Sequence, residues 1–334
     1  MPTQIAVDAM GGDHAPDVVV EGVAAALKSR LGELDVWLTG PADQLSVLVA
    51  QLDPEIQAKI RVVDSPDVIG MDEAPAVALK SKPKSSIHVG LGLCKAGKAD
   101  AFVSAGNTGA VMAGALFIIG RLPGVSRPTA IGYFPTLKGT TILVDVGTNV
   151  GCKPEHLVQF ARMGAVYVEK VMGADNPSVG LLNVGEEPGK GDDLAKSTYA
   201  LLDERSDLNF VGNVEGREVM NHAADVLVCD GFVGNILLKY GESLASSLPR
   251  MIGEEMHRLK MTPEEMSIVG KALSGVKARF DYKEFGGAPL LGVNGTVFIG
   301  HGSSDAYAIK NLVLAADKMV REQVSSTIAE VMSA

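Results

Sequence analysis

The sequence predicts an α/β protein with three α/β/α layers, in which a largely parallel mixed β-sheet lies between two layers of helices. Short apolar runs alternate with segments of helical periodicity along most of the chain. The first elements follow one another as β-α-β-α-β, an order that favours parallel strands with right-handed crossovers. Several apolar runs also stop at Asp, Asn or His beside glycine, as strands do where ligands bind in open α/β sheets.

The length of 334 residues allows one large domain or two, and we expect a single α/β domain spanning residues 1–334. The chain is 46% hydrophobic and 5% aromatic, with 38 glycines, which is typical of a close-packed core. Its net charge of −10 argues against general affinity for nucleic acid or anionic lipid. The three cysteines have no C-x-x-C spacing, so we expect neither a metal site nor a disulfide framework.

Two further observations bear on location. The N-terminus lacks the basic and apolar regions of a signal peptide. No apolar segment reaches the roughly 18 to 20 residues that a membrane span needs. We therefore expect a protein of the reducing cytoplasm, with no transmembrane segment and no nucleic-acid partner.

The N-terminal part is expected to alternate strands and helices. Turn and cap residues precede the first helix, whose apolar face repeats every three or four residues. Prolines interrupt residues 64–86, which we expect to form a loop with a short helix. The expected strands are 5–9, 36–39, 60–63 and 101–103, and the expected helices are 17–28, 42–52, 87–96 and 109–120.

The rest of the chain continues this alternation. A short turn at residues 137–139 predicts an antiparallel hairpin inside the mixed sheet. The expected strands are 130–134, 141–146, 179–184, 210–212, 226–229 and 296–300, and the expected helices are 154–172, 193–203 and 305–331.

Residues 234–285 show helical periodicity only, and we expect them to form a protruding helical hairpin. Apolar residues recur there at three- and four-residue steps, and Pro263 stands at the first position of the second helix. Four of the 13 methionines fall in this segment, and a methionine-rich surface suits an adaptable interface. We expect a dimer contact, a membrane-touching tip, or both. The alternative is a hairpin that belongs to the core.

The stretch at residues 99–114 is the first candidate site. It places a strand end, a turn with Gly106 and Gly109, and the start of an apolar helix in succession. Such a corner offers unpaired backbone N–H groups and the positive end of a helix dipole, which suit phosphate. A plain strand-to-helix connection is the alternative. Similar stops at 7–13, 143–149, 181–185, 226–231 and 297–302 imply one polar, glycine-lined cleft.

The residues of this cleft suit the binding of an anion, and none is an evident nucleophile. The sequence has no G-x-S-x-G elbow and no cysteine with a neighbouring histidine. The bound ligand is therefore expected to be the nucleophile. The candidate phosphate-binding residues are Ser104, Gly106, Asn107, Thr108, Asn149, Ser303 and Ser304, and the candidate catalytic residues are Lys190, Asn235 and His301.

Plainer alternatives exist for several candidates. Lys190 stands between two glycines, where a cation can reach over a phosphate, although the position also fits a solvated loop. His301 ends a strand and suits proton transfer, phosphate binding, or only capping and packing. Asp8, Asp145 and Asp230 also end apolar runs, and we expect them to hold loops or cap helices more often than to catalyse.

Eight runs of residues carry a resemblance to one known family. The runs are IAVDAMGGDHAP at 5–16, SAGNTGA at 104–110, DVGTN at 145–149, CKPEH at 152–156, LLNVGEE at 181–187, DGFVGN at 230–235, GGAPLLG at 286–292 and HGSSDA at 301–306. Together they resemble the bacterial acyl-[acyl carrier protein]:phosphate acyltransferases of phospholipid synthesis. A departure is Gly151, where an acidic residue is common in the family, so the role of that carboxylate is open in this chain.

The resemblance implies that inorganic phosphate attacks the thioester of a fatty acyl-[acyl carrier protein], giving acyl phosphate for phospholipid synthesis and free carrier. It also implies a fold similar to phosphate acetyltransferases and to isocitrate and isopropylmalate dehydrogenases. The implied enzyme needs no metal or organic cofactor, and it is a cytoplasmic homodimer with peripheral membrane attachment. The residues agree, because a phosphate held by glycine-rich loops and Lys190 is its own nucleophile.

The implied carrier protein is typically acidic, whereas this chain itself carries a net charge of −10. Basic residues between 250 and 283 offer a local docking surface, and an ordinary solvated face is the alternative. The expected contacts to the carrier protein or the membrane are Arg250, Arg258, Lys260, Met261 and Met266.

Three other functions stay open. The same fold and phosphate chemistry suit a phosphate acetyl- or butyryltransferase that uses acyl-coenzyme A. A non-catalytic, membrane-associated scaffold for lipid-synthesis enzymes would tolerate the loss of Lys190 or Asn107. A nicotinamide-dependent dehydrogenase is disfavoured, because Lys95 replaces the third glycine of the dinucleotide fingerprint. The preferred length of the acyl chain does not follow from these motifs.

Overall fold

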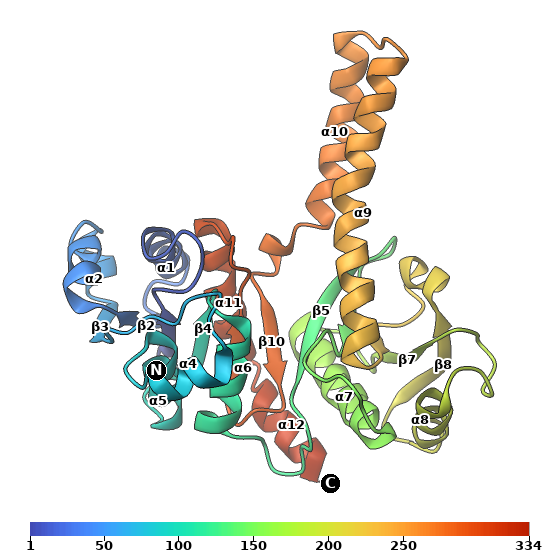
Figure 1. Ribbon diagram of the computed structural model, residues 1–334, viewed down its shortest axis with the longest axis horizontal. Helices are drawn as coiled ribbons and strands as arrows, with labels where there is room; N and C mark the ends of the chain where they lie inside the picture. The colour runs from blue at the N-terminus through green and yellow to red at the C-terminus, as the bar shows by residue number, and fades with distance from the viewer. Residues whose placement is uncertain (334) are drawn as a thin grey trace. The chain divides into compact units, whose positions relative to one another are not determined.

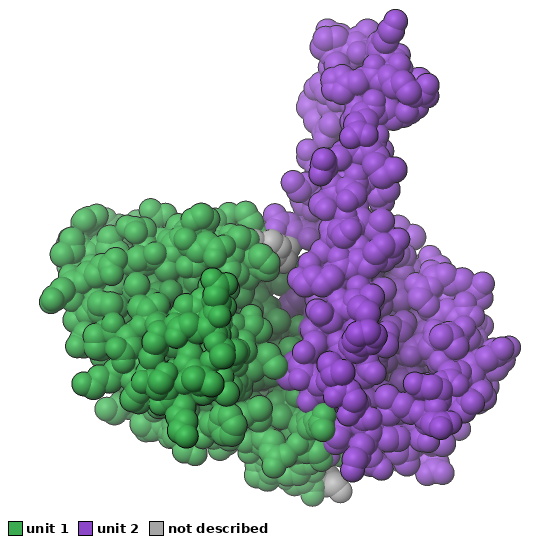
Figure 2. Space-filling view, viewed as in Figure 1, with its two compact units in different colours: residues 1–131, 162–175, 283–334 green, residues 132–161, 176–282 purple. Residues whose placement is uncertain are grey.

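A computed structural model of the chain describes residues 1–333, except for the side chain of Tyr282. The chain divides into two compact units (Figure 2). Unit 1 consists of residues 1–131, 162–175 and 283–334, and unit 2 consists of residues 132–161 and 176–282. Both units combine β-strands with helices (Figure 1), which confirms the mixed α/β class.

Unit 1 is built on strands in the order β3-β2-β1-β4-β11-β10. The strands from β3 to β11 pair in parallel, whereas β10 pairs with β11 in the antiparallel sense. All residues of β4 and β11 are buried, as expected for strands covered on both faces. The bounds are β1 Thr3–Asp8, β2 Leu34–Gly40, β3 Ile60–Asp64, β4 Ala101–Ser104, β10 Ala288–Leu291 and β11 Thr296–Ile299.

Helices cover both faces of these strands (Figure 1). α5 packs on β1, β2 and β4, and α11 packs on β1, β4 and β11. α1 meets α11 at Gly22, where a Cβ would lie 2.5 Å from the Cβ of Ile309, so this approach requires glycine. The bounds are α1 Asp17–Ser29, α2 Ala42–Val49, α3 Pro54–Gln57, α4 Pro75–Ser81, α5 Ser86–Lys95, α6 Thr108–Gly114 with a π-helix at Ala115–Ile119, α11 Ala306–Arg321 and α12 Val324–Ser333.

Unit 2 is built on four parallel strands in the order β6-β9-β7-β8. β5 and α7 each contain residues of both units. α8 has the bounds that the sequence predicts. The bounds are β5 Thr129–Pro135, β6 Thr140–Val144, α7 Pro154–Tyr167 with a π-helix at Val168–Met172, β7 Ser178–Asn183, α8 Asp193–Asp203, β8 Asn209–Glu215 and β9 Val226–Val228.

Unit 2 carries a helical hairpin that extends away from its strands (Figures 1 and 2). It consists of α9 (Gly231–Arg258) and α10 (Pro263–Arg279). Thr262 and Glu265 form a capping box at the start of α10, which satisfies two N–H donors of the first turn. At the other end of α10, Arg279 donates to the carbonyl of Thr136. This bond fixes the base of the hairpin on unit 2.

Two expectations for the C-terminal part are wrong. The single helix expected at 305–331 is broken into α11 and α12, because Gln323 has a left-handed φ of 53° that a continuous helix cannot accommodate. β10 was not expected, because its four residues include Pro289, which lacks a backbone N–H donor.

Candidate active site

Polar residues gather where strands end, in both units. In unit 1 they follow β1, β4 and β11, and in unit 2 they follow β6, β7 and β9. Parallel strands bring their carboxyl ends to the same edge of a sheet, where α/β proteins bind ligands. We call these two groups the Asp8 cluster (Asp8, Ser104, Gly106, Asn107 and Thr108) and the Asp145 cluster (Asp145, Thr148, Asn149, Asp230 and Asn235).

The Asp8 cluster is centred on a buried carboxylate. The Ser104 hydroxyl donates to Asp8 Oδ2 over 2.6 Å, and the Gly106 N–H donates to the Ser104 oxygen over 3.0 Å. Burial raises the pKa of Asp8, against the lowering effect of its hydrogen bonds from Ser104, Ser86 and Met10. A Cβ on Gly11 would lie 2.6 Å from the Gly106 nitrogen, so the β1 and β4 loops touch only because residue 11 is glycine.

Asn107 joins the same loop to a distant segment. Its Nδ2 atom donates to the carbonyls of Gly70, Met71 and Glu73 over 3.0 to 3.1 Å. Its Oδ1 atom accepts the Ala110 N–H and so caps α6. Asn107 and Ser104 are buried, whereas Thr108 is exposed at the start of α6. The polar atoms of Asn107 are thus already used within the protein, and Thr108 presents its side chain to solvent.

The β11 loop lies beside the β1 loop and carries His301. Asp13 donates its N–H to the carbonyl of Gly302 over 2.8 Å. The Ser303 N–H donates to Nδ1 of His301 over 3.2 Å, and the Ser303 hydroxyl lies 2.8 Å from the same nitrogen. Because a backbone N–H only donates, Nδ1 is an acceptor, and the neutral ring carries its proton on Nε2. Ser304 is buried and donates to the carbonyl of His301.

The Asp145 cluster of unit 2 is also centred on a buried carboxylate that accepts hydrogen bonds. Asp145 is buried, and it accepts from the Thr148 N–H over 2.9 Å and from the Asn149 amide over 2.6 Å. Burial raises the pKa of Asp145, and these hydrogen bonds act in the opposite direction. The Asn149 side chain is therefore directed toward Asp145 and holds the loop after β6.

α9 begins against this loop. Cβ atoms would lie 2.7 Å from the Asn149 carbonyl oxygen at Gly231 and 1.9 Å from the Asp145 carbonyl oxygen at Gly234. Only glycine fits such an approach. Asn235 is exposed, and its side-chain carbon Cγ would be 3.4 Å from a Cβ on Gly147. The structure thus brings the predicted residues Asn149 and Asn235 to one loop of unit 2.

Lys190 lies in the loop between β7 and α8. The amide of Asn183 donates to the Lys190 carbonyl over 3.2 Å and to Asn213 over 3.1 Å, and Asn213 donates to the carbonyl of Glu187 over 2.9 Å. The backbone of the loop is therefore held at Glu187 and at Lys190. The Lys190 side chain is 52% exposed, and its ammonium lies 3.9 Å from the Glu187 carboxylate, so this cation remains accessible to an anion from solvent.

A cavity of about 700 Å³ opens beside this loop in unit 2. Its walls come from β7, the β7–α8 loop, α7, α8 and the first turns of α9. Asn213 and this cavity are the features that sequence reasoning missed. The lining residues are Leu157, Leu181, Leu182, Asn183, Val184, Gly191, Asp192, Leu194, Ala195, Gly216, Cys229, Asp230, Val233, Ile236, Leu237 and Tyr240.

Neither Cys94 nor Cys229 is an activated cysteine. Burial raises the pKa of the Cys229 thiol, and burial raises that of Cys94 to about 12. Among the residues that the structure describes, no group of three or more His, Cys, Asp and Glu is placed to hold a metal ion.

The hairpin residues lie far along α9 and at the turn. Arg250, Arg258 and Lys260 are exposed, whereas Met261 and Met266 are half-buried. Arg258 bonds Glu255 on its own helix, and Leu259 is the large apolar side chain that is exposed beside the turn. Within residues 1–333, no helix has the length and apolar character to span a bilayer.

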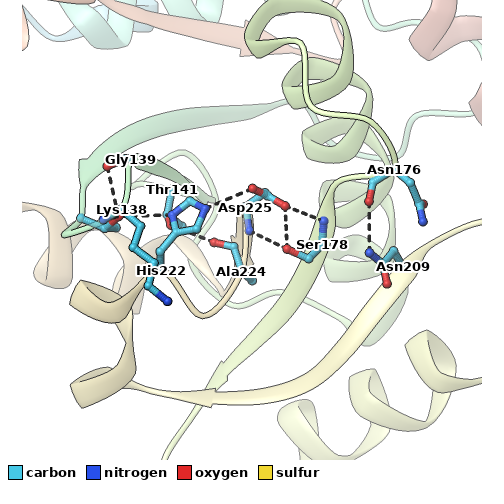
Figure 3. A network of polar contacts seen from close by, with 10 residues as sticks. Lys138, Gly139, Thr141, Asn176, Ser178, Asn209, His222, Ala224 and Asp225 are labelled. Carbon is cyan, nitrogen blue, oxygen red and sulfur yellow. Dashed lines mark hydrogen bonds and ion pairs between the residues drawn. The ribbon is translucent and has the colours of Figure 1, made fainter.

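A second polar network lies at the opposite, amino-terminal ends of the strands of unit 2 (Figure 3). Asp225 accepts from the Ser178 hydroxyl over 2.6 Å and lies 3.2 Å from His222 Nε2. Burial favours a raised pKa for Asp225, but the bonds from Ser178 and His222 outweigh it and hold the pKa below its usual value. Thr141 joins the network through His222 Nδ1. This network ties strand starts together and holds the sheet.

Comparison with known proteins identifies relatives along nearly the whole chain. A sequence model of the family described as "Fatty acid synthesis protein" matches residues 3–327. A phosphate acyltransferase from Salinibacter ruber is 52% identical, with 98% of this chain and 97% of that protein covered. One from Chlorobaculum parvum is 46% identical, with 98% of each chain covered.

Solved structures show the same fold at low sequence identity. A phosphotransacetylase from Streptococcus pyogenes has a TM-score of 0.63 and 17% identity, with 96% of this chain and 94% of that one covered. A branched-chain phosphotransacylase from Enterococcus faecalis has a TM-score of 0.58 and 15% identity, with 95% and 99% covered. These likenesses confirm the phosphotransacetylase-like part of the predicted fold.

Proposed function

We propose, from the premise that the chain belongs to the fatty acid synthesis protein family of phosphate acyltransferases, that it transfers a fatty acyl group from acyl-[acyl carrier protein] to inorganic phosphate. The chain is an acyltransferase, as its named relatives are. A phosphate oxygen attacks the thioester carbonyl carbon, the C–S bond breaks, and the products are acyl phosphate and the free thiol of the carrier. The acyl phosphate then serves phospholipid synthesis.

The exposed position of the Lys190 ammonium is the main support for this proposal. Its accessible ammonium stands on a loop held by Asn183 and Asn213, and a positioned cation stabilises both bound phosphate and the charge that develops in the transition state. In the same proposal the Asn235 amide donates to the thioester oxygen, and Asn149 keeps the β6 loop in place.

Unit 1 carries its own candidates for phosphate binding. Thr108 presents an exposed hydroxyl at the start of α6, and His301 presents a donor at Nε2. We assign both to phosphate binding. Gly106 has no side chain, so that an anion can approach its backbone closely, and Ser303 holds the His301 ring. Ser104, Asn107 and Ser304 support these loops from within.

The direct test compares thioesters. Purified protein is given palmitoyl-[acyl carrier protein] or palmitoyl-coenzyme A, with and without inorganic phosphate, and the released thiol is measured. We expect phosphate-dependent release from the carrier thioester, with acyl phosphate formed in equal amount. Release that ignores phosphate, or no release from an intact carrier thioester, would contradict the proposal.

A phosphate acetyl- or butyryltransferase that uses acyl-coenzyme A is the second candidate. Its support is the fold that the chain shares with phosphotransacetylase and phosphotransacylase structures. Preferred release from short coenzyme A thioesters in the same assay would favour it. A scaffold without catalysis has no support from the named relatives.

The hairpin is proposed to dock the acyl carrier protein. Arg250 and Lys260 are exposed near its end, whereas Arg258 shares its charge with Glu255. Because carrier proteins are acidic, Arg250→Glu together with Lys260→Glu should raise KM for the carrier substrate without changing KM for phosphate. Lys98→Glu, an exposed lysine of unit 1, is the matched control. Equal KM values in all proteins would contradict this docking site.

Peripheral membrane contact is proposed at the α9–α10 turn. Leu259 is exposed there, with Lys260 and Met261 beside it, and such a small apolar area binds bilayers weakly and reversibly. Leu259→Asp should lose flotation with anionic liposomes, and Leu137→Asp, at an exposed leucine of the β5–β6 turn, should retain it. Loss in both variants, or in neither, would contradict the assignment.

A homodimer formed through α9 is proposed as the state in solution. The exposed apolar residues of that helix include Leu244, Leu248, Met251 and Ile252, and a second copy of the chain would cover them. Leu248→Asp should shift sedimentation from dimer to monomer. A wild-type monomer at micromolar concentration would contradict the proposal.

A further inference from the structure

The cavity of unit 2 has the size and chemistry of a ligand pocket. Its volume of about 700 Å³ falls within the roughly 300 to 1,000 Å³ of typical small-molecule sites. Buried Leu157, Leu181 and Cys229 form its floor. Exposed side chains, among them Val184 and Tyr240, stand at its rim. The space is therefore a largely apolar cavity that is open to solvent.

The charged residues of the lining select against anions. They are Asp192 and Asp230, and each carboxylate caps a helix by accepting an N–H, from Ala195 and from Val233, both over 2.8 Å. The described lining residues include no Lys, Arg or His. Two carboxylates and no cation disfavour phosphate or a free fatty acid, whereas a neutral hydrocarbon chain carries no such cost.

One candidate catalytic residue lies beside the cavity, because Lys190 directly precedes Gly191 of the lining. Asn235 lies on another face of α9, since the lining residues of that helix recur at three- and four-residue steps and Asn235 falls outside that series. A chain seated in the cavity would thus leave it beside the loop that carries Lys190. The thioester carbonyl at the end of that chain would then lie near Lys190.

We infer that this cavity binds the hydrocarbon chain of the acyl donor, with the thioester at its rim. The inference rests on the proposed function for the identity of the donor, and it makes the cavity the determinant of chain length. Burial of each methylene stabilises the complex by about 0.8 kcal/mol, which corresponds to roughly fourfold in affinity. Affinity should therefore rise with chain length until the cavity is full.

Ala195 offers a way to shorten the cavity. It lies on α8, is half-buried and lines the space, so Ala195→Phe places a ring in the cavity. Ala200→Phe is the matched control, because Ala200 is an exposed alanine of the same helix outside the lining. Ala195→Leu gives a milder filling if the phenylalanine variant unfolds. Circular dichroism and thermal unfolding report on folding of each variant.

The experiment measures binding without turnover. Dodecanoyl and butanoyl thioesters of N-acetylcysteamine, which are neutral, are titrated calorimetrically into the full chain in the absence of phosphate. The wild type should bind the dodecanoyl probe at least about tenfold more tightly than the butanoyl probe. Ala195→Phe should lose about tenfold or more of the dodecanoyl affinity and leave the butanoyl affinity within about twofold, with Ala195→Leu in between.

Three outcomes would overturn the inference: equal affinity for the two probes, unchanged dodecanoyl affinity in folded Ala195→Phe, or an equal loss in Ala200→Phe. If probe binding depends on the cavity but the protein releases no thiol with phosphate, the inference stands and the proposed function is removed. Thiol release with phosphate, together with an unchanged preference for acyl chain length in Ala195→Phe, would support the proposed function and overturn the inference.

Discussion

The Asp8 cluster and the Asp145 cluster are built alike but leave different groups accessible. Each centres on a buried aspartate whose pKa burial raises, and each aspartate accepts a 2.6 Å bond from the loop it holds. In unit 1, Ser104 and Asn107 use their polar atoms inside the protein. In unit 2, the side chains of Asn235 and Lys190 are exposed. A polar residue at a strand end is thus a candidate for ligand binding only where its polar atoms are not already used in bonds within the protein.

The largest expected effect is at Gly234. Gly234→Ala drives a Cβ to 1.9 Å from the Asp145 carbonyl oxygen, so the start of α9 must move away from the β6 loop. We expect a loss of about 3 kcal/mol in the free energy of unfolding, together with loss of activity. Gly253→Ala on the same helix is the control, because a Cβ there meets nothing within 4 Å, and it should gain up to about 1 kcal/mol. Denaturant unfolding measures both, and equal stabilities would contradict this packing.

Asn235→Ala should separate function from stability. The side chain is exposed, so unfolding should change by less than about 0.5 kcal/mol. Loss of a donor to the thioester oxygen should lower kcat by about 100-fold. Steady-state kinetics of the variant and of Asn221→Ala, an exposed asparagine elsewhere in unit 2, test this. A kcat as high as that of the wild type would remove Asn235 from the chemistry.

Asn107→Ala should behave in the opposite way. The variant loses three bonds to backbone carbonyls and the cap of α6, and we expect about 2 kcal/mol less stability. Asn107→Asp retains the capping oxygen but not the donor, so its loss should be smaller. Thermal unfolding of both variants, with phosphate KM measured on the folded fraction, distinguishes support of the loop from direct binding. Unchanged stability with a raised phosphate KM would reverse our assignment.

The smallest expected effect concerns pH. Because burial raises the pKa of Asp145 above its ordinary value of 3.8, the folded state holds its proton more tightly than the unfolded state does. The stability that this proton contributes is full below pH 3.8 and is lost as pH rises through the raised pKa. Asp145→Asn should therefore lack this loss. The difference in Tm between variant and wild type, followed from pH 4 upward, should move in favour of the variant, and a difference independent of pH would contradict the argument.

The local parts of this fold follow from the sequence, and the long-range parts do not. α8 begins and ends where capping and periodicity place it, at Asp193–Asp203. Asn107 looked like a phosphate ligand because only its neighbours in sequence were visible, whereas three of its partners lie at residues 70–73. The cavity was missed for the same reason, since its lining comes from residues between 157 and 240 on separate elements. Neighbours in space determine whether a polar side chain already bonds within the protein or is available to a ligand.

In the proposed reaction Lys190 binds the attacking phosphate, and the kinetics of thiol release test this role. Thiol release from palmitoyl-[acyl carrier protein] is followed against phosphate concentration for wild type, Lys190→Ala and Lys196→Ala, the last being an exposed lysine of α8. We expect Lys190→Ala to lose about 100-fold in kcat/KM for phosphate, while Lys196→Ala stays within about twofold of wild type. The same phosphate dependence in wild type and in folded Lys190→Ala would contradict the claim.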